Sequence, residues 1–434
     1  MPVFLRHDDP DFAAQFDRLA TQKREDDAGV DHDVAAIIAD VRRRGAAAVV
    51  ELTRRYDRWE ATPETLAFSE AEIDAATADL PAAEMEALTL AAERIRAYHA
   101  RQLPEDAAWT DETGVRLGWR WRAVRAAGLY VPGGTAAYPS SVLMNAVTAK
   151  VAGVEHLAMC VPTPDGAINT LVLAAARLAG VDRIWRIGGA QAIAALAYGA
   201  DPVEAVDVIT GPGNAYVAAA KRQVFGHVGI DMIAGPSEVL VIADAANDPD
   251  WIAIDLLAQA EHDMSAQAIC VTDDAAFGEE VMRAVERRLQ RLQRAEIAGE
   301  SWRRHGAVVV ARDLAHAADL TDRVAPEHLE IAVAAPEALA ARIRNAGAMF
   351  LGRHTPEAIG DYVGGPNHVL PTAGSARFSS GLSVLDFMKR TTVTAVPAEG
   401  LAAIGPAAAT LADAEGLEAH ALSVRARLSA GDLS

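Results

Sequence analysis

The feature that most constrains the fold is a pattern that occurs three times between residues 149 and 209. Each time a helix-forming stretch ends at a glycine (Gly153, Gly180 and Gly199), and a short run of apolar, β-favouring residues follows. Glycine commonly ends helices because it adopts left-handed backbone conformations at little cost. Repeated units of this length predict β–α–β crossovers, in which helices cover a parallel sheet. We therefore expect an α/β domain over residues 128–236.

The same alternation continues after residue 237. Apolar, β-favouring runs are separated by a helical stretch that begins at Pro249 and by a charged helix that ends near Arg294. This indicates a second doubly wound unit. Residues before 127 have apolar side chains at three- and four-residue spacing, which is typical of helices. We expect them to pack with the second unit. The apolar runs are residues 238–243, 268–271 and 307–310.

The predicted fold class is therefore α/β, with two doubly wound, Rossmann-like domains and small helical extensions at both ends. One domain is discontinuous. The C-terminal extension is too small to fold alone, so it should pack on its own chain or on a partner subunit. The predicted divisions are 1–25 (N-terminal helical extension), 26–127 with 237–381 (the discontinuous α/β domain), 128–236 (the continuous α/β domain) and 382–434 (C-terminal helical tail).

Composition excludes several classes of protein. The 434 residues include 60 acidic and 40 basic side chains, a formal net charge of −20, which disfavours binding to nucleic acid or to an anionic membrane. No run approaches the ~18 apolar residues that a membrane-spanning helix needs. The N-terminus lacks the features of a signal peptide. Cys160 and Cys270 lie among apolar residues and cannot form a disulfide framework, so we expect buried thiols and a cytoplasmic protein.

Two glycine turns are candidates for binding a nucleotide. Residues 188–193 and 211–216 each lie between an expected strand and an expected helix. Small residues there let backbone N–H groups approach a phosphate at the positive end of the helix. Neither turn has the full G-x-G-x-x-G pattern. Each could equally be an ordinary tight connection.

A polar group near the end of the helix that starts at Pro249 could bind a metal. Gln259 and His262 lie three residues apart and share one face, and imidazole nitrogen with amide oxygen suits Zn²⁺. Such a pair is more often a solvated helix end. Asp361, in what we expect to be a glycine-framed turn, and His420 are further candidate ligands. The sequence alone does not bring these four residues together.

Glu327 and His328 are adjacent and follow Pro326, at an expected helix start. Neighbouring side chains of a helix diverge by about 100°, so the two would have different tasks, such as activating water and moving a proton. The alternative is that Glu327 only stabilises a helix N-terminus. The segment 364–372 holds glycines, two prolines and His368, which suggests a rigid binding loop. Residues 235–238, with Ser237, are similar on a smaller scale.

Taken together, nine segments resemble the histidinol dehydrogenase family, and they occur in the family's order along nearly the whole chain. Any one of these motifs is short, but nine in order are specific. They are residues 128–134, 188–191, 211–214, 234–240, 259–262, 325–330, 360–362, 367–372 and 415–420.

The resemblance implies an enzyme of the last two steps of histidine synthesis. The family oxidises L-histidinol to L-histidinal and then to L-histidine, with two NAD⁺, and holds one Zn²⁺ per subunit. It is a homodimer whose C-terminal tail reaches into the other subunit's site. The matching residues are Gln259, His262, Asp361 and His420 for the metal; Glu327 and His328 for acid–base chemistry; Ser237, His328, His368 and Glu415, with the metal ligands, for substrate; and Tyr130, Gln191 and Asn214 for NAD.

We consider two alternative functions, one from the same superfamily and one from another class of protein. A dehydrogenase of a sulfonated diol would share the scaffold and the metal, but an anionic sulfonate favours cations where Glu415 places a carboxylate. A catalytically inactive metal-binding or scaffolding relative would not be expected to keep the full set of candidate residues. Both alternatives are weaker than histidinol oxidation.

Overall fold

The computed structural model describes residues 2–22, 28–133 and 138–429. Gly134, the last residue of one family segment, lies outside these ranges, as do small parts of both predicted extensions. The chain divides into two compact units. The first comprises residues 1–102 and 125–387, and the second comprises residues 103–124 and 388–434.

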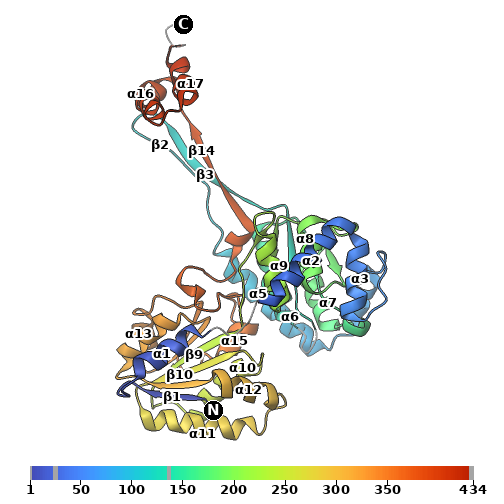
Figure 1. Ribbon diagram of the computed structural model, residues 1–434, viewed down its shortest axis with the longest axis vertical. Helices are drawn as coiled ribbons and strands as arrows, with labels where there is room; N and C mark the ends of the chain where they lie inside the picture. Colours follow the sequence, from blue (N-terminus) through green and yellow to red (C-terminus); the bar gives the residue numbers. More distant parts are fainter. Residues whose placement is uncertain (1, 23–27, 134–137, 430–434) are drawn as a thin grey trace. The chain divides into compact units, whose positions relative to one another are not determined.

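The α/β class with parallel sheets is confirmed in the first unit, which contains two sheets (Figure 1). One has five parallel strands in the order β6-β5-β4-β7-β8. The helices that alternate with its first four strands end at Gly153, Gly180 and Gly199, as predicted. The elements are β4 (Ala126–Tyr130), α6 (Pro139–Ala152), β5 (His156–Cys160), the 3₁₀ turn Pro164–Gly166, α7 (Thr170–Ala179), β6 (Arg183–Trp185), α8 (Gly189–Tyr198), β7 (Val208–Thr210), α9 (Ala215–Val224) and β8 (Gly229–Ile230).

The predicted partner of the helices between residues 28 and 100 was wrong. We expected residues 26–127 to pack with residues 237–381, but their helices cover the five-stranded sheet. Helix α2 packs on α8 and α9, while α4 packs on α7 and α5 on α6. Apolar side chains of α2 and α3 share one buried core with α8 and α9. These helices are α2 (Ala28–Arg44), α3 (Ala46–Asp57), α4 (Glu70–Ala78) and α5 (Ala82–Ala100).

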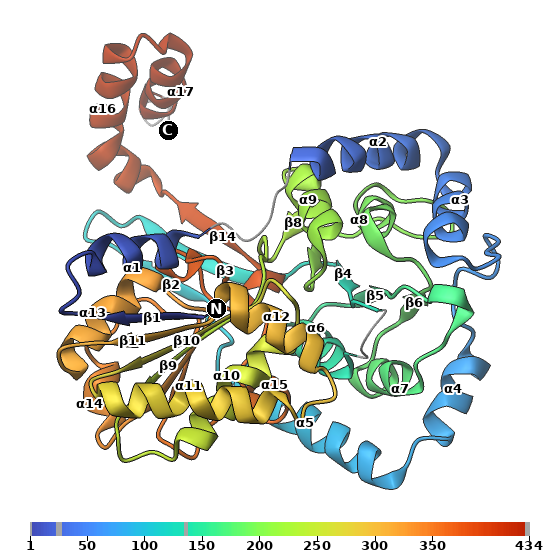
Figure 2. The same ribbon diagram turned by 60° about the horizontal axis from the view of Figure 1, so that its bottom comes forward.

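The second sheet has six parallel strands in the order β1-β11-β10-β9-β12-β13. Helices cover both of its faces (Figure 2), each over its own apolar core. Its later elements are β9 (Glu238–Ala243), α10 (Pro249–Ala260), β10 (Gln267–Thr272), α11 (Ala275–Leu289), α12 (Ala295–His305), β11 (Ala307–Val310), α13 (Leu314–Val324), β12 (His328–Ala332), α14 (Pro336–Ala340), β13 (Ala348–Leu351), α15 (Glu357–Tyr362) and the 3₁₀ turns Ser375–Arg377 and Val384–Phe387.

The N-terminal segment is part of this second sheet and not a purely helical extension. Strand β1 (Val3–Arg6) pairs with β11, and α1 (Phe12–Thr21) follows it. Phe12, Phe16 and Leu19 lie in the core that α13 and α14 also cover. The segment is too short for its strand to be recognised without the partner strand.

The order of strands reverses once in each sheet, between β4 and β7 and between β9 and β12. At such a point the loops leave the carboxyl ends of the strands in opposite directions, and ligands commonly bind there. In the six-stranded sheet this point is closed. The Asn247 amide donates to the carbonyl of Ala332 and to Asp244, and Asp244 accepts the backbone N–H of Ala334. The site of this domain must therefore lie elsewhere.

The second unit combines a small antiparallel sheet with two helices. Its strands run in the order β14-β3-β2. The tail predicted as helical thus begins with a strand that pairs with residues 116–123, far away in sequence. The elements are β2 (Ala107–Thr110), β3 (Arg116–Ala123), β14 (Met388–Ala395), α16 (Ala398–Ala414) and α17 (Glu418–Ser429), and the two helices pack on each other.

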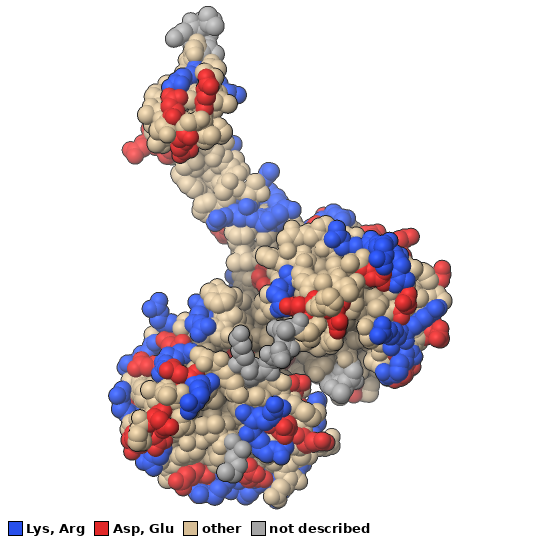
Figure 3. Space-filling model, in the orientation of Figure 1, with Lys and Arg blue, Asp and Glu red and all other residues tan. Residues whose placement is uncertain are grey.

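Charges are mixed on the surface. Lys and Arg intermingle with Asp and Glu on the face that Figure 3 shows. Within the described ranges, no helix is long and apolar enough to cross a membrane.

Candidate active site

A cavity of about 730 Å³ opens in the first unit, beside the amino end of β12. His328, Asp361 and His368 contribute polar groups to its wall. Apolar residues such as Phe350 share the wall with further polar ones such as Arg94. A concave cavity that combines apolar walls with convergent polar groups is typical of a small-molecule site.

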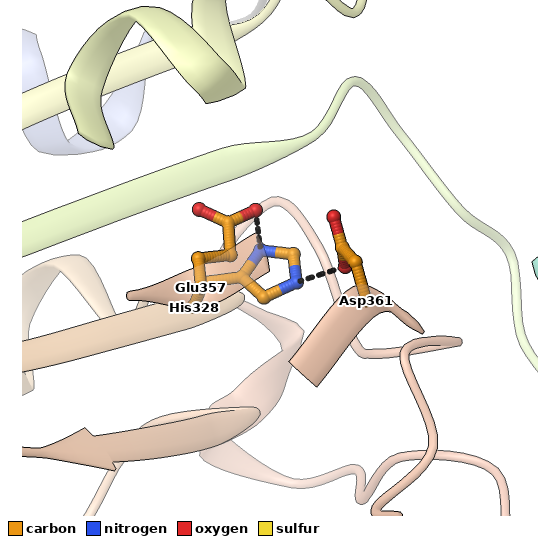
Figure 4. Close-up of side chains that lie close together, drawn as sticks. All are labelled: His328, Glu357 and Asp361. Carbon is orange, nitrogen blue, oxygen red and sulfur yellow. Dashed lines mark ion pairs between the residues drawn. The ribbon is translucent and has the colours of Figure 1, made fainter. Parts of the chain in front are cut away.

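His328 is the first residue of β12 and is buried. Its Nδ1 lies 3.0 Å from the backbone oxygen of Glu238 and 3.3 Å from Oε1 of Glu357. A carbonyl only accepts, so Nδ1 carries the proton in the neutral ring. Nε2 lies 3.9 Å from Oδ1 of Asp361 and has no hydrogen-bond partner among the described residues (Figure 4). This nitrogen can accept a proton.

Burial lowers the pKa of His328 to about 4, although Asp361 and the Glu238 carbonyl act in the opposite direction. The imidazole is therefore neutral near pH 7. A buried neutral imidazole with an unpartnered Nε2 has the protonation state that a general base needs.

The segment 325–330 was expected to start a helix, and this was wrong. His328 begins a strand that pairs with β9, so the predicted acid–base pair lies at the amino end of β12, beside that of β9. Glu327 is buried, and its Oε2 accepts the backbone N–H of Glu238 at 2.9 Å. The apolar run that follows His328 is a buried strand, because both its faces are covered by helices.

Asp361 lies in a short helix, α15, and not in a glycine-framed turn as expected. Gly360 is required there, because a Cβ atom would overlap the ring of Phe350. This close approach places α15 directly on the cavity wall. The turn after the helix brings His368 back, and its Nδ1 lies 3.0 Å from the backbone oxygen of Asp361.

The loop that carries His368 is attached to the five-stranded domain, and its predicted rigidity has a structural basis. The Asn367 amide donates to the carbonyl of Met144 and to Thr148 on α6. Nε2 of His368 lies 3.3 Å from the hydroxyl of Ser141, in the first turn of the same helix. The site thus joins the two sheets of the first unit.

The predicted metal ligands are partly brought together. Gln259, at the end of α10, is fully buried, and neither polar atom of its side chain has a hydrogen-bond partner among the described residues. Helix α10 packs on α15, which carries Asp361. The charge of His262, just after α10, acts on both His328 and His368. An orphaned buried amide beside a carboxylate and imidazoles fits a bound divalent ion.

The remaining predicted site residues are divided between the units. Ser237 precedes β9, whose first residues contact Glu327 and His328. Glu415 and His420 lie in the second unit, at the end of α16 and the start of α17, and both are exposed. Their side chains are available for contacts outside their own hairpin.

Two site residues were missed by the sequence analysis. Glu357 is buried and belongs to a group, with His328 and Asp361, whose potential ligand atoms lie within 4.8 Å of one another. Proline followed by glutamate marks a helix start, which could have located Glu357 but not its neighbours. Ser141 gave no signal, because its partner His368 is 227 positions away.

The predicted NAD-binding residues lie at the carboxyl edge of the five-stranded sheet, near the point where its strand order reverses. Tyr130 ends β4, and its buried hydroxyl accepts the backbone N–H of Gly189 at 3.0 Å. Gln191 is buried in the first turn of α8. The Asn214 side chain caps α9 by accepting from the N–H groups of Tyr216 and Val217. Both glycine turns thus lead into helix N-termini.

A buried ion pair holds the second glycine turn. Lys221 pairs with Asp231, and both side chains are almost fully buried. Lys221 also donates to the carbonyl of Gly211 at 3.0 Å, while Asp231 accepts the Gly211 N–H at 2.8 Å. Both polar groups of Gly211 are therefore fixed. The φ of Gly211 is +113°, and a Cβ atom would overlap the carbonyl of Tyr130.

Two Rossmann-like parallel sheets, joined at a buried imidazole–carboxylate cluster in a cavity, define this protein as an α/β enzyme. The family model of histidinol dehydrogenase matches residues 20–428. The histidinol dehydrogenases of Ruegeria pomeroyi and Rhodospirillum rubrum are 68% and 64% identical, each over 99% of this chain and at least 99% of their own length. The chain therefore belongs to the histidinol dehydrogenase family and is a dehydrogenase.

A solved structure agrees with this assignment. The crystal structure of histidinol dehydrogenase from Elizabethkingia anophelis matches with a TM-score of 0.94 at 34% identity, over 99% of both chains. The fold is thus retained although about two thirds of the aligned residues differ.

Proposed function

We propose that this protein oxidises L-histidinol to L-histidine through L-histidinal, with two NAD⁺ consumed, in the last steps of histidine biosynthesis. Family membership supports the substrate. The observation that carries the chemistry is the neutral, buried His328, whose Nε2 has no hydrogen-bond partner among the described residues and which lines the cavity.

In the alcohol step, Nε2 of His328 takes the hydroxyl proton as hydride leaves the carbinol carbon. NAD⁺ supplies the hydride acceptor when bound. Because Nδ1–H is held by the Glu238 carbonyl, the ring cannot rotate away from this orientation. A fixed tautomer is what a positioned base requires.

In the aldehyde step, Glu327 deprotonates the water that attacks the aldehyde carbon. Its carboxylate lies next to His328 at the strand ends, with Oε2 3.7 Å from Nδ1. A second hydride transfer then gives the carboxylate of histidine. Since one site holds both a base for the alcohol and a base for water, the aldehyde can stay bound between the two steps.

We propose Gln259, His262, Asp361 and His420 as the ligands of one Zn²⁺ per subunit. The unpartnered buried amide of Gln259 supports this set. The metal, when bound, would orient the amine and imidazole of the substrate. Ser237, His328, His368 and Glu415 would complete the substrate contacts, with the Glu415 carboxylate near the substrate amine.

We propose that NAD binds along Tyr130, Gln191 and Asn214. The reversal of strand order in the five-stranded sheet supports this location, because dinucleotides commonly bind at such a point. Ser141 supports it too. It lies in the helix that follows β4, hence at the carboxyl edge, and it contacts His368 of the catalytic cavity. Cofactor and base would thus approach each other from the two domains.

We further propose a cytoplasmic homodimer, in which Glu415 and His420 complete the partner's site. Their exposure on a small unit of their own supports this role. The two cysteines are buried and free, which agrees with a reducing compartment.

The test is the stoichiometry of NADH formation from histidinol, with a sulfonated diol as the competing substrate. We expect two NADH per histidinol, no turnover of the diol, and loss of activity after complete chelation. Accumulation of free histidinal at one NADH per substrate would reject the coupled oxidation. Full activity in metal-free protein would reject the zinc site.

A further inference from the structure

Glu357 is a buried carboxyl group in the site to which the proposed chemistry gives no task. Its Oε1 lies 3.3 Å from Nδ1 of His328, and its Oε2 has no hydrogen-bond partner among the described residues. The close-up in Figure 4 shows His328 between Glu357 and Asp361, with Nδ1 facing Glu357 and Nε2 facing Asp361. Glu357 is therefore on the side of the ring opposite the proton-accepting nitrogen.

The backbone holds Glu357 in this place. It is the first residue of α15, directly after Pro356, and its N–H donates to Oε1 of Glu330 at 2.6 Å. Glu330 lies two residues after His328 on β12 and so projects from the same face of the strand. The strand that carries the base thus also anchors the helix that carries the carboxylate. The position of the Glu357 carboxylate is therefore fixed relative to the His328 imidazole.

We propose that Glu357 is a positioning residue for His328, whose carboxylate stabilises the positive charge that the imidazole acquires when Nε2 takes the substrate proton. The proposal rests on the role of His328 as base in the proposed function. A carboxylate on the far nitrogen of a catalytic histidine has this effect in serine proteases, where it is not itself protonated. No atom is transferred to Glu357. Its charge lowers the energy of the protonated ring.

The other groups around the ring differ from Glu357 in charge, in distance or in the nitrogen that they face. The Glu238 carbonyl fixes the tautomer but has no charge. Glu327 is farther from Nδ1, at 3.7 Å, and already accepts a backbone N–H. Asp361 also favours a positive charge on His328, but it faces Nε2, the nitrogen that takes the proton, whereas His262 and His368 disfavour that charge. Glu357 is the nearest carboxylate to Nδ1 among the described residues.

Burial and the surrounding carboxylates raise the pKa of Glu357 well above its usual value, whereas a positive charge on the imidazole 3.3 Å away favours the ionised carboxylate. The rival interpretation is that Glu357 is a metal ligand, since its oxygen lies within 4.8 Å of potential ligand atoms of His328 and Asp361. The metal content of Glu357 variants distinguishes the two interpretations.

The experiment compares Glu357→Gln, which keeps the size and removes the charge, with Glu357→Asp, which keeps the charge. We expect Glu357→Gln to lower kcat for histidinol about 10- to 100-fold while KM changes by less than about threefold, because the loss concerns the transition state. Glu357→Asp should retain more kcat than Glu357→Gln. Metal content should stay at the wild-type level in both.

The matched control is Glu330→Gln. It removes an equally buried carboxylate on the strand that carries His328, but it keeps an oxygen to accept the Glu357 N–H. Its kcat should fall much less than that of Glu357→Gln. If Glu357→Gln does not fold, Glu357→Asp and Glu357→Asn give the same comparison of charge at equal length.

Three results would overturn the proposal: wild-type kcat in Glu357→Gln, a rise in KM with unchanged kcat, or loss of the metal. The wild-type protein distinguishes this failure from that of the proposed function. If wild type forms no NADH from histidinol, the proposed function fails. If wild type is active and Glu357→Gln is equally active, only the role of Glu357 is rejected.

Discussion

At the scale of single residues, the proposed chemistry gives different tasks to two adjacent side chains, Glu327 and His328. The backbone of β9 holds both: Glu238 accepts from His328 through its carbonyl and donates to Glu327 through its N–H. Both residues are thus fixed by one peptide segment.

We expect Glu327→Gln to impair aldehyde oxidation far more than alcohol oxidation, since only the aldehyde step needs an activated water. The amide keeps an oxygen that can accept the Glu238 N–H, so the local structure should persist. Loss of a general base commonly costs about 10²- to 10⁴-fold in the step that it serves. Single-turnover measurements that start from histidinol and from histidinal resolve the two steps. Equal losses in both would contradict the division of tasks.

A second residue-scale prediction concerns the effect of pH on stability. Burial raises the pKa of Asp57 from 3.8 to about 6, although the Thr163 N–H opposes this. A raised pKa in the folded state means that folding favours the protonated acid, so this contribution to stability is complete below pH ~4 and is lost as pH rises through ~6. Asp57→Asn should therefore lose less stability than wild type between pH 4 and pH 7, as measured by urea unfolding.

Asp165→Asn is the control, because Asp165 lies nearby but is exposed, and Arg58 lowers its pKa. It should leave the slope of stability against pH in this window almost unchanged. An identical slope in wild type and Asp57→Asn would show that Asp57 does not titrate as proposed.

At the scale of elements, the glycine turn between β7 and α9 shows how closely backbone segments meet. Gly211 has φ +113°, and its missing side chain makes room for the carbonyl of Tyr130. Lys221 and Asp231 then fix its polar groups from within the core. The turn is thus held by a buried pair and not by the ligand that it is proposed to bind.

We expect Gly211→Ala to destabilise the protein by more than Gly226→Ala. Both have positive φ, which costs a residue with a side chain about 1–3 kcal/mol. A Cβ atom at Gly226 (φ +100°) meets open space, whereas at Gly211 it overlaps backbone. The difference between the two free energies of unfolding, measured with denaturant, should be at least ~1 kcal/mol. Equal losses of stability in the two variants would mean that the turn shifts to accommodate the added Cβ atom at no further cost.

Sequence patterns located most elements but not all their partners. The glycine-terminated helices of the five-stranded sheet were predicted because their signal is local, and β9 and β11 have the predicted bounds. Strand β1 and the β14–β3 pair were missed, since short strands are specified by distant partners. For the same reason, helices α2 to α5 were assigned to the wrong domain: their apolar faces do not reveal which sheet they cover.

Within the site, types of residue were predicted more readily than their geometry. His328, Glu327, Gln259 and Asp361 were all singled out, yet His328 begins a strand where a helix was expected, and Asp361 lies in a helix where a turn was expected. Glu357 had no distinguishing pattern of its own. Its significance arises only from the fold, which brings it to His328.

At the scale of the whole molecule, the proposed metal and substrate contacts are divided between two compact units of the chain. Gln259, His262 and Asp361 belong to the first unit, and Glu415 and His420 to the second. If the second unit serves the partner's site in a dimer, function depends on the pairing of two chains.

Two inactive variants should then restore each other's activity. His262→Asn has an intact second unit and a defective first unit, and His420→Asn has the reverse. After mixing and subunit exchange, about half of the dimers are mixed, each with one intact site, so activity should recover to roughly a quarter of wild type. No recovery despite demonstrated exchange would show that each site is built within one chain.

No proposed function involves the carboxyl edge of the six-stranded sheet, where the reversal point is closed. His328 begins β12, and Ala332 ends it, roughly 13 Å away at ~3.3 Å per residue. Arg312 is exposed, directly after β11, at that far edge. A fluorophore or a surface linker attached there would report on the enzyme, or tether it, from the end of the domain remote from its chemistry. The exposed edge at Arg312 is therefore a suitable place at which to immobilise or label the protein.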